Sequence, residues 1–115
     1  MTDSAAEHTG ALGLDLKHEP LPADTVVLGN PSTAVRELED LAGCGVGIWE
    51  MTPGTATDTE AEEVFVVLSG KARLVFLDDG STLDVATGDV VRLRQGQRTS
   101  WTVTETLRKI YFAGQ

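Results

Sequence analysis

The sequence predicts an all-β domain, either a sandwich or a small barrel, and three observations support this fold class. From Cys44 to Phe112, apolar and β-branched residues fall in short runs that are typical of strands. Pairs such as Asp79-Gly80 and Gly96-Gln97 separate these runs and suit tight turns. No segment in this region has the apolar period of a helix.

The N-terminal part of the chain is less regular. Residues 1–24 mix Thr, Ser, Ala, Glu and Pro without a steady period, so we expect a mobile arm ahead of a domain at 25–115. The run 25–28 predicts a first strand, which ends at Gly29-Asn30-Pro31. A short helix is predicted over 32–41, because Pro31 suits its first turn and its apolar residues lie on one side.

Strands account for the rest of the domain. Their predicted ranges are 44–51, 62–69, 71–77, 81–86, 89–93, 99–104 and 107–112. The run 64–68 is apolar at every position, so both of its faces must be covered. One face would lie against the barrel interior and the other against a second sheet or a partner subunit, and we therefore expect a homodimer.

Composition narrows the classes of function. The 115 residues suffice for one domain, and 18 acidic against 9 basic side chains give a net charge of −9. Nucleic acid or an anionic membrane would need a basic surface, so neither is expected as a partner. No apolar run approaches the roughly 20 residues of a membrane span, and the first residues are acidic, unlike a secretory signal, so we expect a cytoplasmic protein. The single cysteine, Cys44, cannot form an internal disulfide.

Two glycine-anchored segments have the order and spacing of a known family. The first runs from Pro53-Gly54 through Glu62-Glu63 to Gly70, and the second from Gly88-Asp89 to Gly96. The segments 47–54, 100–103 and 108–111 extend the similarity. Over about residues 25–113 the chain resembles the cupins, and more narrowly the small single-domain cupins grouped with ureidoglycine aminohydrolase. The resemblance implies a cupin jelly-roll barrel whose mouth commonly holds a ligand or a metal.

Metal-binding cupins use two histidines separated by one residue, a glutamate shortly after them, and a late histidine. Counting back from Gly70, the resemblance puts the glutamate at Glu63 and the histidine positions at Thr57, Thr59 and Thr99. A threonine hydroxyl is a poor ligand for transition metals, so we expect no metal and no cofactor.

Two further points concern a metal ligand set. A shift of one position in the alignment would bring Asp58 into the site. The only histidines, His8 and His18, lie in the arm, where we expect them to contact solvent alone.

Strand alternation suggests which side chains share the barrel interior, because residues two apart in a strand lie on one face. The candidate catalytic groups are Glu63, Lys109 and Tyr111, and the candidate ligand contacts are Thr57, Thr59, Thr99 and Trp101. Each has a structural alternative. Glu63 could instead be paired with Lys109 or Arg73, and Trp49 and Trp101 could fill the core rather than stack on a ligand.

The predicted function is a metal-free cupin barrel that binds a small organic molecule. One alternative is a metal-independent acid/base enzyme, a hydrolase, isomerase or cyclase, in which Glu63 transfers protons while Lys109 or Tyr111 polarises the substrate. Another is a barrel closed by its own side chains that serves as a dimer or interaction module.

Overall fold

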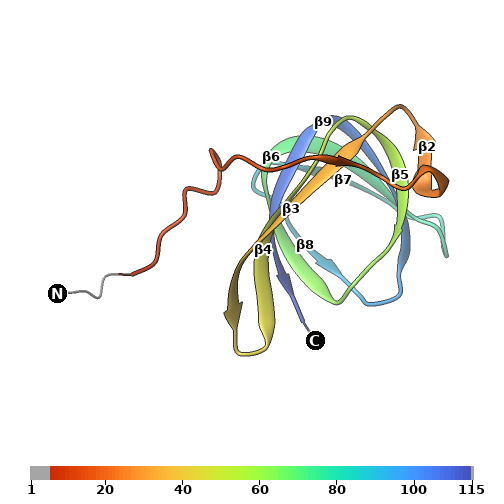
Figure 1. Ribbon diagram of the computed structural model, residues 1–115. Coiled ribbons are helices and arrows are strands. Elements are labelled where there is room, and N and C mark those ends of the chain that lie inside the picture. Colours follow the sequence, from red (N-terminus) through yellow and green to blue (C-terminus); the bar gives the residue numbers. More distant parts are fainter. Residues whose placement is uncertain (1–5, 115) are drawn as a thin grey trace.

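The computed structural model describes residues 6–114, and within this range the chain forms nine strands and one turn of 3-10 helix (Figure 1). The elements are β1 (Glu19–Pro20), η1 (Ala23–Thr25), β2 (Val26–Leu28), β3 (Ser32–Leu41), β4 (Cys44–Met51), β5 (Gly54–Thr59), β6 (Glu63–Phe76), β7 (Thr82–Ala86), β8 (Val90–Leu93) and β9 (Arg98–Ala113). The all-β barrel predicted from the sequence is confirmed. In the same range, no helix is long and apolar enough to cross a membrane.

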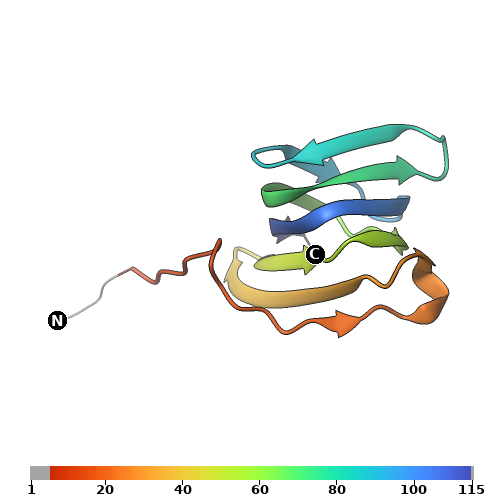
Figure 2. The same cartoon turned by 90° about the horizontal axis from the view of Figure 1, so that it is seen from above.

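The two longest strands, β6 and β9, connect the whole sheet. On one side, β9 pairs with β5 through its first half and with β4 through its second half. On the other side it pairs with β6 from Phe76↔Thr99 to Glu63↔Ala113. The remaining part of the sheet follows from these pairs, with β3 beyond β4 and with β7 and β8 beyond β6. Figure 1 shows the strands as a ring, and Figure 2 shows them stacked from β3 to β7.

Each long strand replaces two shorter predicted strands. The ranges 62–69 and 71–77 form the single strand β6, and 99–104 with 107–112 form β9. Their shared register shifts between Val67 and Ala72, around Gly70. Gly70 has a φ of 94°, and a Cβ there would overlap the carbonyl of Thr106 on β9. Glycine therefore lets the strand bend and stay paired, where the sequence suggested a break.

The predicted helix over 32–41 is wrong, because this segment is strand β3. It pairs antiparallel with β4 along its length, and Ala42 and Gly43 join the two strands with positive φ values of 53° and 81°. Two successive residues with positive φ are typical of a two-residue hairpin turn. The apolar residues that suggested a helical face are not buried together, since Val35 and Leu41 are both exposed. Strand pairing thus overrides a weak helical pattern.

From Ala11 onward, the arm lies against the barrel. Strand β1 pairs with β3, and Leu21 packs on the core. The guanidinium Nη1 of Arg108 donates hydrogen bonds to the carbonyls of Ala11 and Leu12, at 2.8 and 3.1 Å. Figure 2 shows the arm turning from the outside of the barrel onto β3. Residues 1–5 lie outside the described range, and the boundary at residue 24 and the mobility of the arm stay predictions.

The apolar core fills the barrel beside β6. Phe65, Leu74, Leu93 and Leu107 are fully buried there. Other members of this core cluster, Met51, Ala56 and Trp101, also line the cavity described next. The core therefore forms the floor of that cavity.

Candidate functional site

A cavity of about 480 Å³ opens at the mouth of the barrel. Its walls come from η1 and the residues before it, from β3 and β4, from β5 with the loop that follows it, from the first residue of β6, and from β9. A volume of this size is within the range of small-molecule sites, which are generally apolar with a few placed polar groups. Leu21 and Pro22 of the arm close one side of the cavity.

The floor of the cavity is aromatic and holds a buried ammonium group. The rings of Trp49 and Trp101 lie 5.4 Å apart, and Phe65 lies 5.6 Å from Trp101. The Nζ atom of Lys109 is 4.3 to 4.9 Å from the centroids of all three rings. Such contacts are favourable because the ring faces carry negative charge density.

Lys109 also forms an ion pair with Glu63. The Nζ to Oε2 distance is 2.6 Å, and the side chains are only 6% and 11% exposed. The structural alternative considered for Glu63, a buried carboxylate paired with Lys109, is thus present. The pair compensates both charges, which leaves neither group free in the resting site.

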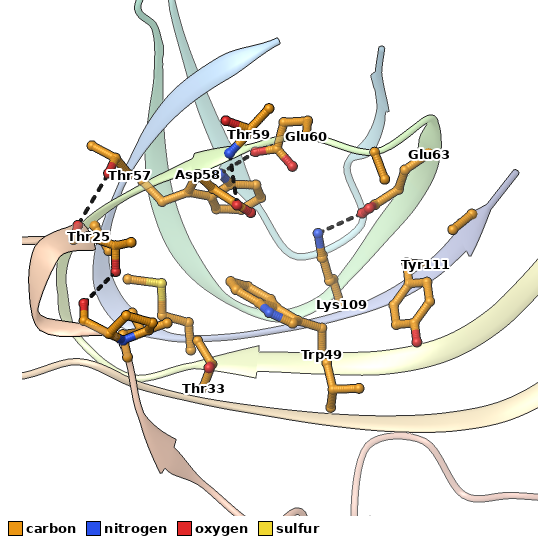
Figure 3. A pocket seen from close by; sticks show the side chains of 18 residues that line it. Thr25, Thr33, Trp49, Thr57, Asp58, Thr59, Glu60, Glu63, Lys109 and Tyr111 are labelled. Atoms are coloured by element: carbon orange, nitrogen blue, oxygen red, sulfur yellow. Dashed lines mark hydrogen bonds and ion pairs between the residues drawn. The ribbon is translucent and has the colours of Figure 1, made fainter. Parts of the chain in front are cut away.

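Glu60 is a buried carboxylate that the sequence analysis missed. The residue is 6% exposed, and its Oε2 accepts hydrogen bonds from Thr99 Oγ1 at 2.5 Å and from Trp101 Nε1 at 2.8 Å. Its backbone is fixed by Gln97 and Gly96, at 2.8 and 2.9 Å. The second carboxylate oxygen, Oε1, has no hydrogen-bond partner among residues 6–114. Glu60 lines the same cavity as Glu63 (Figure 3).

Asp58 adds a second carboxylate to the same wall. It lies directly opposite Thr99 in the register of β5 and β9, so both side chains face the same side of the sheet. Partial burial and the nearby charge of Glu60 raise the pKa of Asp58 above its ordinary value. The Oδ1 atom of Asp58 accepts a hydrogen bond from the backbone N–H of Thr59 at 2.8 Å (Figure 3).

The side chains of Thr57 and Thr59 point to the opposite face of β5 from that of Asp58. Thr57 donates a hydrogen bond to the carbonyl of Thr25 at 3.4 Å, and Thr59 is exposed at the rim. The side chains of Thr57 and Thr59 therefore do not share the face of Thr99, contrary to the first alignment, although both residues still line the cavity at its rim. The alternative shift, which brings Asp58 into the site, agrees with the structure.

The structure brings six of the seven predicted site residues to the cavity wall. They are Thr57, Thr59, Glu63, Trp101, Lys109 and Tyr111. Thr99 is fully buried and does not line the cavity, because it lies behind Glu60 and holds that carboxylate. The catalytic and ligand-binding roles of these residues stay predictions.

Tyr111 contributes a neutral phenol. Burial, together with the charges of Glu37 and Glu63, raises the pKa of Tyr111 above its ordinary value. The hydroxyl therefore keeps its proton at neutral pH and can donate a hydrogen bond to a ligand.

His18 differs from its prediction. Its Nε2 lies 2.6 Å from Oε2 of Glu50, and its Nδ1 lies 2.9 Å from the hydroxyl of Ser32, so it does not contact solvent alone. Arg108 Nε donates to the other oxygen of Glu50 at 2.9 Å. Burial alone would raise the pKa of Glu50, but the hydrogen bonds from Arg108 and His18 outweigh it and hold that pKa below its ordinary value.

Metal binding has no evident centre in the part of the chain that the structure describes. No group of three or more His, Cys, Asp and Glu side chains there is arranged to hold an ion. The absence of a metal or cofactor in the working protein stays a prediction.

The ring of strands, with a ligand-sized cavity in its mouth, defines a cupin barrel. Residues 38–111, more than half of the chain, match the EutQ-like cupin domain family, so the chain belongs to that family. The narrower resemblance to ureidoglycine aminohydrolase is not confirmed. The comparison with curated proteins gave no match.

Solved structures agree with this fold. The EutQ protein of Clostridium difficile is 22% identical, with a TM-score of 0.64 over 73% of this chain and 68% of that one. A DUF861 family protein of unknown function from Pseudomonas syringae is 26% identical, with a TM-score of 0.74 over 87% of this chain and 44% of that one. A DUF861 family protein from Thermotoga maritima is 30% identical, with a TM-score of 0.54 over 57% and 75%. The chain thus spans less than half of the Pseudomonas protein.

Proposed function

We propose that this cupin domain binds a small organic molecule in the cavity at the mouth of its barrel, without a metal. The observation that carries the proposal is Oε1 of the buried residue Glu60, which has no hydrogen-bond partner among residues 6–114 and lies on the wall of a cavity of about 480 Å³. An N–H or O–H group of a ligand in the cavity could donate a hydrogen bond to this acceptor. The apolar floor beneath it supplies the contact area that a small ligand needs.

The cavity argues against the interpretation of a barrel closed by its own side chains. Trp49 and Trp101 pack on each other and on the core, yet both still line open space. A homodimer remains part of the proposal, supported by the apolar run 64–68, and sedimentation velocity tests it.

A metal-independent acid/base enzyme is the second candidate, favoured by the raised pKa of Asp58 beside Glu60. A carboxyl group with a raised pKa suits a general acid or base role, and Glu60 lies on the same cavity wall. The originally predicted base, Glu63, is the weaker candidate because Lys109 compensates its charge at 2.6 Å.

The activities that the names of related proteins suggest are not part of this proposal. The Clostridium protein is called EutQ, and its 22% identity supports a shared fold alone. The metal site that the resemblance to ureidoglycine aminohydrolase implies needs histidines, and the only histidines of this chain, His8 and His18, lie in the arm.

The two tryptophans of the chain provide a direct test, since both line the cavity. We expect some members of a library of small amines, alcohols and carboxylates to change the tryptophan fluorescence saturably and to raise the unfolding temperature. A library without any such compound would contradict the proposal. Turnover of a bound compound that Asp58→Asn abolishes would favour the enzyme, whereas binding without turnover would favour a sensor.

A further inference from the structure

The charges that line the cavity do not balance. Its carboxylates are Asp58, Glu60 and Glu63, and its only cation among residues 6–114 is Lys109. Lys109 and Glu63 compensate each other through their ion pair at 2.6 Å. Asp58 and Glu60, labelled in Figure 3, have no such cation among the lining residues that the structure describes, so they leave uncompensated negative charge at the mouth of the barrel.

From this arrangement we infer that the cavity selects small organic cations, whose ammonium or amidinium group sits between the carboxylates of Asp58 and Glu60. The inference rests on the proposed function and names its class of ligand. A cationic group would supply an N–H donor to Oε1 of Glu60, for which residues 6–114 provide none, and it would lower the repulsion between the two acids.

Glu60 is built as an acceptor in a fixed position. Thr99 and Trp101 both donate to its Oε2, at 2.5 and 2.8 Å, and its own backbone is held at both the N–H and the carbonyl. The side chain cannot turn away without breaking these bonds. Oε1 is therefore presented to the cavity at little entropic cost on binding.

The aromatic floor holds the apolar part of the ligand rather than its charge. Lys109 already occupies the ring faces of Phe65, Trp49 and Trp101. The remaining apolar lining includes Met51 and Ala56. A ligand with its charge toward Asp58 and Glu60 would place its hydrocarbon part against this remaining apolar lining.

An anionic ligand is disfavoured by the same geometry. It would have to take Lys109 from Glu63, which would leave a buried carboxylate unpaired. It would also meet the charges of Asp58 and Glu60. Recognition of a neutral ligand would leave those two charges unchanged.

Three probes with a similar hydrocarbon framework test the inference: 2-phenylethylammonium, 2-phenylethanol and 3-phenylpropanoate. We expect the cation to bind at least about tenfold more tightly than the alcohol at low salt and neutral pH, as measured by tryptophan fluorescence, because charge-assisted hydrogen bonds are stronger than neutral ones. The anion is expected to bind more weakly than both. Asp58→Asn and Glu60→Gln should each lower the preference for the cation over the alcohol, and Glu105→Gln, at an exposed acid outside the cavity, should leave it unchanged.

Each outcome has a distinct meaning. Equal binding of the cation and the alcohol, or tightest binding of the anion, would overturn the cation inference and leave the proposed function standing. Binding of none of the three would overturn the inference and count against the proposed function as well. Because Glu60→Gln changes a buried network, Asp58→Asn at the more exposed position keeps the test valid if the Glu60 variant fails to fold.

Discussion

Two carboxylates close together at the cavity mouth impose a cost on the folded protein that should depend on pH. The folded-state pKa of Asp58 lies above the unfolded value of 3.8, through partial burial and the charge of Glu60. Between these two pKa values the folded protein binds more protons, so its stability falls as pH rises through this window. The cost is then fully present at neutral pH.

We therefore expect Asp58→Asn to stabilise the protein at neutral pH, by less than about 1 kcal/mol because solvent screens the exposed side chain. Asparagine keeps the acceptor for the Thr59 amide. Urea unfolding should show the gain at neutral pH and its loss below pH 3.8. Asp84→Asn is the control, since the hydrogen bond from Arg73 lowers the pKa of Asp84 and its removal should not stabilise. A gain that does not depend on pH would contradict this account.

The buried Lys109–Glu63 pair gives a second prediction at the scale of single residues. Lys109→Met leaves the Glu63 carboxylate, whose side chain is 11% exposed, without its cation. Breaking a buried pair from one side generally costs about 3–5 kcal/mol, so a loss of this size is expected in denaturant unfolding. Adding Glu63→Gln should recover much of it, because no unpaired charge remains. Additive losses in the double variant would show that the two groups act independently.

Glu60 marks the limit of sequence reasoning at this scale. Counting back from Gly70 found Glu63 but put Thr57 and Thr59 inward, and a phase error of one residue turns every side chain of a strand to the other face. The pairing of Asp58 with Thr99 sets the true phase. That pairing joins positions distant in the chain, so local spacing could not supply it.

At the scale of elements, glycines decide where strands bend. Gly70 and Gly88 have the same φ of 94°, but a Cβ at Gly70 would overlap Thr106 whereas one at Gly88 would meet nothing within 4 Å. Alanine at Gly88 should cost about 1–2 kcal/mol, from the left-handed backbone alone. Alanine at Gly70 should cost clearly more, because β6 and β9 must also separate. Equal losses in thermal unfolding would mean that the close approach does not constrain the bend.

The elements themselves were largely predictable, because alternation and turn residues are local signals. Strand β4 has the predicted bounds, and β7 and β8 differ by one residue at the start. The helix prediction for 32–41 failed because the signal there is not local. Pairing with β4 makes this segment a strand, whereas its own apolar pattern is ambiguous. Strand β5 was missed because its threonines and Asp58 lack an apolar run.

At the scale of the whole molecule, a cluster of charges adds to the β1–β3 pairing and to Leu21 in attaching the arm to the barrel. Glu50 accepts from His18 and from Arg108, and Arg108 also holds the carbonyls of Ala11 and Leu12. This cluster positions the segment that supplies Leu21 to the cavity wall. The shape of the cavity therefore depends on contacts between distant parts of the chain.

We expect His18→Ala to loosen the arm without unfolding the barrel. Hydrogen exchange over residues 11–24 should become faster, because the contacts of His18 with Glu50 and Ser32, at 2.6 and 2.9 Å, are lost. His8→Ala is the matched control, since that histidine is exposed in the same arm. Faster exchange in both variants, or in neither, would show that the cluster does not hold the arm.

The same cluster should release the arm in acid. The pKa of Glu50 is held below 4.5 by the hydrogen bonds from Arg108 and His18, which outweigh its burial. A lowered folded-state pKa contributes stability that is present above 4.5 and is lost as pH falls through the folded value. In the wild type, protection of residues 11–24 should therefore hold down to pH 4.5 and then decline, after correction for the intrinsic exchange rate. In Glu50→Gln the arm should already exchange faster at neutral pH. Its protection should then show no further decline below pH 4.5, because the titrating carboxyl group is gone.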